Sequence, residues 1–129
     1  MIGIINYGLG NIKAIYTVYK NLNVPVKIIS DTKEFDDCNK FILPGVGAYK
    51  QGMEILKKTY LDEKLYDYLA KPNSFVYGIC LGMQLLFNKS YEFAVSDGLN
   101  LINGSVVKFH NNIKANTTHL GWNKFKIQS

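Results

Sequence analysis

The sequence predicts an α/β fold: an open, mostly parallel β-sheet with helices on both of its faces. Short apolar runs recur along the chain, segments with helical periodicity separate several of them, and glycine-rich turns follow the runs directly. Strands that are apolar almost throughout are buried on both sides, as in a parallel sheet covered by helices. The length of 129 residues suits a single domain, so we expect one domain over residues 1–129.

The composition narrows the possible functions. Hydrophobic residues make up 47% of the chain and charged residues 19%, which is typical of a globular protein. All 15 basic residues are scattered lysines, and arginine, the usual bidentate reader of phosphates and bases, is missing. We therefore expect no nucleic-acid partner. We also expect a cytoplasmic protein with no membrane contact, because the sequence has no signal-peptide pattern, bilayer-length apolar run or disulfide framework. We expect no metal and no cofactor.

The first strand is expected at Met1–Ile5 and is followed by a turn-rich loop and a helix over 12–22. Gly8 and Gly10 lie between strand and helix, as in a dinucleotide-binding loop. The third glycine of that pattern is replaced by Lys13, so a tight strand-to-helix turn is the better interpretation.

Two further strands are expected at 24–29 and 40–43. The polar, acidic connection between them predicts a loop or a one-turn helix. It contains Cys38, which has no flanking glycines and is interpreted as a bystander rather than a nucleophile.

A glycine-containing loop, Pro44–Ala48, follows the third strand directly. Glycines at the carboxyl end of a parallel strand let the backbone approach a ligand closely. Amphipathic helices are expected next, over 49–57 and 61–69.

The stretch 75–87 predicts a buried strand, a sharp turn and a helix over 83–87. The turn has the G-x-C-x-G spacing of a nucleophile elbow, with Cys80 at its centre between Gly78 and Gly82. A side chain at either glycine is expected to clash. Cys80 is expected to be strained and to lie at a helix start, where a thiolate is stabilised. The N–H of Leu81 then points at an oxyanion, and the 44–48 loop offers a second donor, which predicts acyl-transfer chemistry.

The remaining chain is less regular. Residues 88–103 form a mixed segment with turns, 105–109 predict a strand, and 110–117 predict a polar surface loop. An alternating run at Phe125 and Ile127 predicts an edge strand.

Four motifs together resemble a known family. They are Asn6–Ile12 (NYGLGNI), Leu43–Tyr49 (LPGVGAY), Gly78–Phe87 (GICLGMQLLF) and His119–Asn123 (HLGWN). The chain is similar to the triad, class I glutamine amidotransferases, which have a flavodoxin-like fold. Within that group it resembles the glutaminase subunits of imidazole glycerol phosphate synthase, an enzyme of histidine biosynthesis.

The resemblance implies roles for individual residues. Cys80 is the nucleophile that attacks the side-chain amide of glutamine, giving a thioester and ammonia. The resemblance also implies an oxyanion hole and a glutamine-binding set. The oxyanion hole comprises Val46, Gly47 and Leu81, and the glutamine-binding residues are Gly45, Gln84 and Glu92.

The implied partner is a (β/α)8-barrel cyclase subunit, which receives the ammonia in a heterodimer. The motif at His119, Gly121, Trp122 and Asn123 lies towards the synthase interface in this family.

The chain also departs from the family pattern. Asn6 stands where an aspartate is usual, and Thr118 where a proline is usual. The family's catalytic histidine and carboxylate lie beyond the HLGWN motif, and neither His110 nor His119 matches them. We therefore expect the sequence to be the N-terminal two-thirds of a domain truncated at its C-terminus. Without the base, activity at least about 10²-fold lower is expected.

Three alternatives stay open at this point. One is a related amidotransferase subunit for another pathway, such as surface-sugar amination. Another is a non-catalytic fragment that binds a partner. The third is a different cysteine hydrolase with the same elbow, which Gln84 and the HLGWN motif disfavour.

Overall fold

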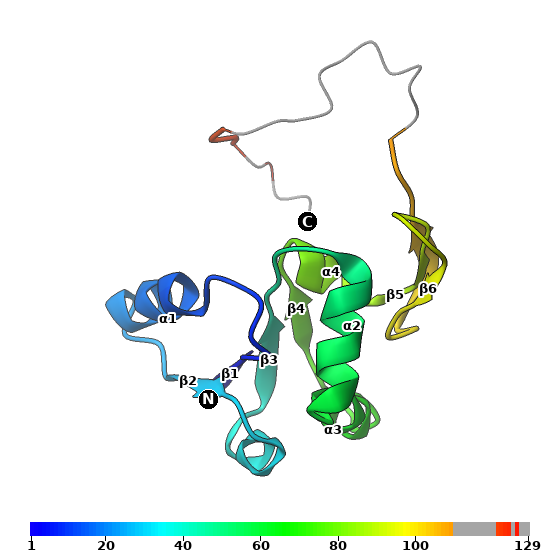
Figure 1. Cartoon of the computed structure of the whole chain (residues 1–129). Coiled ribbons are helices and arrows are strands. Elements are labelled where there is room, and N and C mark those ends of the chain that lie inside the picture. The colour runs from blue at the N-terminus through cyan, green and yellow to red at the C-terminus, as the bar shows by residue number, and fades with distance from the viewer. Residues whose placement is uncertain (110–120, 125, 127–129) are drawn as a thin grey trace.

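A four-stranded parallel sheet forms the centre of the protein, which we describe from a computed structural model (Figure 1). The structure describes residues 1–109, 121–124 and 126. Counted across the sheet, the strand order is β2-β1-β3-β4. The strands are β1 (Ile2–Ile5), β2 (Val26–Ile29), β3 (Lys40–Leu43) and β4 (Val76–Gly78). All three pairings are parallel, as the sequence predicts.

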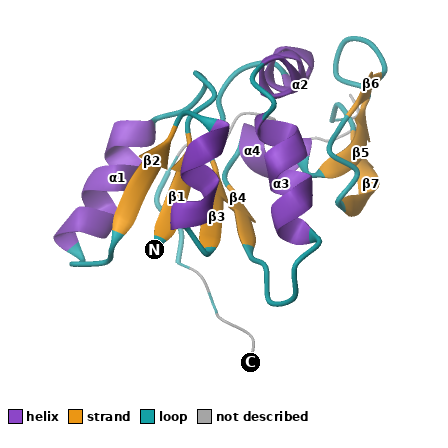
Figure 2. Ribbon diagram, turned by 90° about the horizontal axis from the view of Figure 1, so that it is seen from below, coloured by secondary structure: helices purple, strands orange, loops and turns teal. Residues whose placement is uncertain are grey.

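Helices cover both faces of this sheet (Figure 2). The core is divided into two hydrophobic clusters, one on each face of the sheet, and neighbouring residues of β1 belong to different clusters. Ile4 belongs to the cluster that packs against α1 (Ile12–Asn21), and Ile5 belongs to the larger cluster on the other face. The larger cluster includes side chains from η1 (Thr32–Asp37), α2 (Tyr49–Lys58) and α3 (Leu61–Leu69). The predicted α/β architecture is therefore confirmed.

A second, three-stranded sheet follows the elbow. The short helix α4 (Leu81–Leu85) leads directly into β5 (Phe87–Ser90), which lies between β6 (Ser96–Asp97) and β7 (Ile102–Val106). Strand β5 pairs antiparallel with β6 and parallel with β7.

The helix predicted over 83–87 was wrong in its bounds, because α4 ends at Leu85 and Phe87 begins a strand. Backbone N–H groups from the 99–102 segment explain the early end. Leu99 donates to the Leu85 carbonyl at 2.8 Å, and Leu101 donates to the Leu86 carbonyl at 2.9 Å. The carbonyls at the end of the helix are thus satisfied by another segment rather than by a further helical turn.

The strand expected at 105–109 lies three residues earlier in the structure, because β7 starts at Ile102 and pairs with Phe87. The expected surface loop over 110–117 and the edge strand at Phe125 and Ile127 involve positions outside the described residues. Among the helices that the structure describes, none has the length and apolar character needed to cross a membrane.

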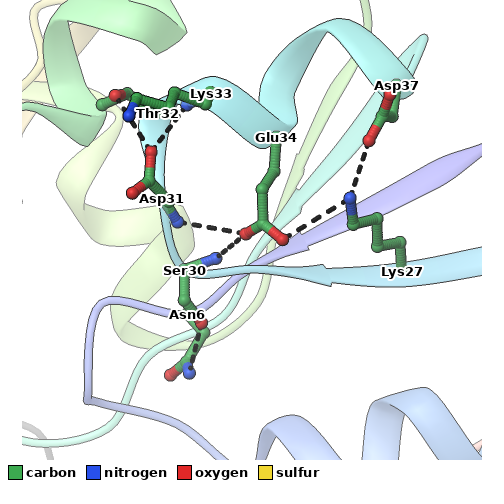
Figure 3. A network of polar contacts seen from close by, with 8 residues as sticks. All are labelled: Asn6, Lys27, Ser30, Asp31, Thr32, Lys33, Glu34 and Asp37. Carbon is green, nitrogen blue, oxygen red and sulfur yellow. Dashed lines mark hydrogen bonds and ion pairs between the residues drawn. The ribbon is translucent and has the colours of Figure 1, made fainter.

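A polar network closes the turn between β2 and η1 (Figure 3). Asp31 caps η1 by accepting from the N–H of Lys33 at 2.8 Å. Glu34 reaches back and accepts from the N–H groups of Ser30, at 2.8 Å, and Asp31, at 3.1 Å. The Asn6 side-chain amide donates to the Ser30 hydroxyl at 3.0 Å, which ties the end of β1 to the end of β2.

Candidate active site

Cys80 lies in the turn between β4 and α4, and its side chain is exposed. Its backbone has φ +54° and ψ −119°. A positive φ is uncommon for a residue with a side chain, and the strain must be offset by the surrounding structure. The expected strained conformation of Cys80 is therefore confirmed.

The two glycines of the elbow are sterically required. A Cβ on Gly82 would overlap the carbonyl oxygen of Leu43, the last residue of β3. A Cβ on Gly78 would lie 2.5 Å from the Cα of Met83. The predicted clashes are confirmed, and the one at Gly82 is with the neighbouring strand.

The Pro44–Ala48 loop lies beside the elbow. The N–H of Ile79 donates to the Leu43 carbonyl at 2.9 Å, which fixes the start of the elbow to the end of β3. Gly45 is buried, whereas Val46 and Gly47 are exposed, and Gly47 has a positive φ of +101°. Leu81 is the first residue of α4, so its N–H has no acceptor within the helix. The start of this loop packs against the start of α4, because a Cβ on Gly45 would lie 2.8 Å from the Leu81 Cβ.

Gln84 and Glu92, both expected to hold glutamine, line one hollow of about 460 Å3. The rest of its lining is Phe93, Val106, Val107, Lys108 and Phe109. Gln84 is one turn from Cys80, and its N–H donates to the Cys80 carbonyl at 3.2 Å. The Glu92 carboxylate accepts from the N–H of Tyr49 at 3.3 Å, so it is held at the start of α2.

The interface residues are placed only in part. His119 lies outside the described residues, while Gly121, Trp122 and Asn123 are exposed. His110 is also outside them, so no histidine occurs in the part of the chain that the structure describes.

Cys38 differs from Cys80 in its surroundings. It is buried in the larger core cluster, and burial raises the pKa of its thiol. A raised pKa keeps the group as an unreactive thiol near neutral pH. This environment agrees with its interpretation as a bystander.

Sequence reasoning missed Tyr7. It lies two residues after the end of β1, is buried, and donates a hydrogen bond from its hydroxyl to the Pro44 carbonyl at 2.8 Å. The available signal was its place at the carboxyl end of a parallel strand, where ligand sites of such sheets form.

Comparisons with known proteins agree with this geometry. Residues 3–127 match the family described as "Glutamine amidotransferase class-I". Similar curated relatives are named "Imidazole glycerol phosphate synthase subunit HisH". The one from Caldanaerobacter subterraneus subsp. tengcongensis is 41% identical over 128 residues, which are 99% of this chain and 62% of the relative. The one from Bacillus subtilis is 35% identical over 133 residues, which cover 100% of this chain and 62% of the relative. The chain thus spans less than two-thirds of these relatives' length.

Solved structures share the fold at low sequence identity. One is described as "Crystal structure of glutamine amidotransferase" and has a TM-score of 0.72 at 14% identity. The match covers 88% of this chain and 58% of the other chain. A putative peptidase E protein from Listeria monocytogenes has a TM-score of 0.58 at 13% identity. The match covers 78% of this chain and 62% of the other chain. The fold, the elbow and the match over residues 3–127 lead to one conclusion. The chain belongs to the class-I glutamine amidotransferase family.

Proposed function

We propose that this protein is a glutaminase subunit that releases ammonia from glutamine for a synthase partner in imidazole glycerol phosphate formation, a step of histidine biosynthesis. One observation carries the proposal: an exposed cysteine, Cys80, in a strained strand-to-helix elbow beside a glycine loop. Membership in the amidotransferase family and curated relatives named as subunits of that synthase support the choice of substrate and pathway.

In the proposed reaction the Cys80 thiolate attacks the carbonyl carbon of the glutamine side-chain amide. A carbon–sulfur bond forms, and the carbonyl electron pair moves to oxygen to give an oxyanion. When the oxyanion collapses, the carbon–nitrogen bond breaks, and the nitrogen leaves as ammonia after taking up a proton. Water then attacks the thioester and releases glutamate, with the cysteine restored. We assign no general base among the described residues.

The neighbouring groups have separate tasks in this proposal. The N–H of Leu81 and the peptides around Val46 and Gly47 stabilise the oxyanion, because backbone N–H groups are effective donors to the negative charge that develops on the carbonyl oxygen. Gln84 and Glu92 bind the polar ends of glutamine in the hollow that they share. Glu92 supplies a negative charge for the substrate ammonium group, and the lack of a side chain at Gly45 lets the loop pack closely against Leu81 and Gly82 of the elbow.

The proposed partner is a (β/α)8-barrel cyclase subunit that receives the ammonia within a heterodimer. Curated relatives carry the name of a synthase subunit, which supports a partner of this kind. We place His119 and the exposed residues Gly121, Trp122 and Asn123 at the interface. We also place the protein in the cytoplasm, where reducing conditions keep an exposed thiol such as Cys80 available.

A glutaminase assay with and without the cyclase subunit tests the proposal. Glutamate is expected to form, faster in the presence of the cyclase, and Cys80→Ala is expected to abolish its formation. Cys38→Ser is the matched control, because that cysteine lies just before β3, at the opposite end of the strand from the elbow, and its loss is expected to leave turnover unchanged. Wild-type turnover equal to that of Cys80→Ala would overturn the proposal. Stimulation by a sugar-modifying enzyme in place of the cyclase would assign the ammonia to a different pathway.

A further inference from the structure

The Tyr7 hydroxyl joins the segment after β1 to the loop after β3 through one hydrogen bond. The side chain of Tyr7 is 3% exposed, and its hydroxyl donates to the Pro44 carbonyl at 2.8 Å. Pro44 is itself buried and is the first residue after β3, where the glycine loop begins. A buried carbonyl that loses its donor bears a desolvation cost, so this bond constrains the loop strongly.

The same hydroxyl touches the region where loop and elbow meet. A Cβ on Gly45 would lie 2.5 Å from the Tyr7 oxygen and 2.8 Å from the Leu81 Cβ. A Cβ on Gly82 would lie 2.9 Å from the Pro44 carbonyl oxygen. The first peptides of the loop therefore pack directly between the Tyr7 hydroxyl and the start of α4.

The pKa of Tyr7 indicates that its hydroxyl stays protonated and remains a hydrogen-bond donor. Burial raises the pKa of Tyr7 well above its usual range, and negative charge on Cys80 raises it further. The phenol therefore keeps its proton near neutral pH and continues to donate to Pro44.

We propose that Tyr7 is a positioning residue: by holding the Pro44 carbonyl, it fixes the backbone of Gly45, Val46 and Gly47 beside Cys80 so that the loop is ready to stabilise an oxyanion. The inference rests on the proposed function for its biological substrate. The acyl transfer that it describes applies to any ester or amide that Cys80 attacks. Tyr7 acts through the loop and does not contact the reacting atoms.

Two reactions of Cys80 separate this role from a purely structural one. With p-nitrophenyl acetate, the thiolate adds to the carbonyl carbon, an oxyanion forms, and p-nitrophenolate leaves with the electron pair of the broken carbon–oxygen bond, giving an acetyl thioester. With iodoacetamide, the thiolate displaces iodide from a saturated carbon, and no oxyanion forms. Only the first reaction needs the loop.

The experiment measures both rates in Tyr7→Phe and in the wild-type protein, with the Cys80→Ala rate subtracted as background. The rate of acylation is expected to fall about tenfold, because a tenfold change in rate corresponds to an activation free energy of about one hydrogen bond. Alkylation and its pH dependence are expected to stay within about twofold. Tyr66→Phe is the matched control, because it removes a hydroxyl that donates to the Leu99 carbonyl at 2.7 Å, a bond that involves neither the loop nor the elbow. Its two rates are expected to match those of the wild type.

Equal acylation rates in Tyr7→Phe and wild type would overturn the inference. So would a parallel fall in acylation and alkylation, which indicates general damage, or a shifted pH profile of alkylation, which indicates an effect on the thiol. If Tyr7→Phe does not fold, Tyr7→Met, which also lacks the hydroxyl, replaces it with the same expectations. Glutamine turnover is measured separately, so a wild-type protein that acylates but does not hydrolyse glutamine refutes the proposed function and leaves the test of Tyr7 valid.

Discussion

Backbone strain at Cys80 sets the chemistry of the site at the scale of single residues. Five non-glycine residues have a positive φ among the described residues, and three of them are asparagines, which tolerate it well. Cys80 has no such tolerance, and a conformation of this kind costs on the order of 1–3 kcal/mol. Hydrogen bonds of its neighbours hold the turn, including the 3.0 Å bond from the Gly82 N–H to the Ile79 carbonyl. In this turn conformation Cys80 is exposed.

Gly82→Val tests the steric basis of the elbow. The new side chain would collide with the backbone of Leu43, which cannot move without disturbing β3. We expect loss of folding, or a decrease in the free energy of unfolding of about 3 kcal/mol or more, measured by urea denaturation. Gly52→Ala is the control, since its Cβ would meet only leucine side chains, at 3.2 Å or more. A Gly82→Val protein with wild-type stability and activity would show that the elbow is misplaced.

At the scale of elements, the sequence was most informative where the signal is local. The bounds of β3 and α3 agree with the predicted ranges, because apolar runs and helical periodicity depend on neighbouring residues alone. The end of α4 was missed because hydrogen bonds from the 99–102 backbone, far along the chain, replace its last turn. The position of β7 was missed for a similar reason, because it depends on the pairing of Ile102 with Phe87 of β5. Such non-local contacts leave no periodic pattern in the sequence.

The turn before η1 gives a pH-dependent prediction. The backbone N–H groups of Ser30 and Asp31 are the main reason that the pKa of Glu34 lies below its usual range (Figure 3). A lowered folded-state pKa means that the ionised carboxylate stabilises the fold above the unfolded-state pKa of about 4.3. This stabilisation is lost as the pH falls through the folded-state pKa.

Glu34→Gln should therefore be less stable than the wild type at neutral pH, and the difference should shrink as the pH falls below the unfolded-state pKa of about 4.3. Urea denaturation of both proteins across this range measures the difference. Glu54→Gln is the control, because Glu54 is exposed and makes only a 3.9 Å ion pair, with Lys50. A difference between wild type and Glu34→Gln that stays constant with pH would contradict the assignment.

At the scale of the whole molecule, strand order assembles the site. Strand β3 lies between β1 and β4, so the carboxyl ends of three parallel strands meet at one edge. Tyr7, the loop from Pro44 and Cys80 come from these three ends. The motifs predicted the glycine loop and the cysteine elbow from the sequence alone. The contribution of Tyr7 required the order of the strands, which local patterns do not encode.

Trp122 reports on the proposed partner. It is the only tryptophan in the sequence, and its side chain is fully exposed. If it lies in the interface with the cyclase subunit, its fluorescence emission should move to shorter wavelength when the cyclase is added, because burial removes water from the indole ring. The spectrum of a mixture with Trp122→Phe is subtracted to remove the cyclase's own signal. An emission that does not move although the two proteins co-elute would place Trp122 outside the interface.

The central claim is that Cys80 forms a thioester with the side-chain carbonyl of glutamine. Rapid acid quenching of the protein with glutamine and its cyclase partner, followed by peptide mass spectrometry, tests it most directly. We predict a peptide containing Cys80 that carries the added mass of a glutamyl group and loses it in hydroxylamine. The same peptide unmodified while glutamate accumulates, or a glutamyl group on any other residue, would contradict the account.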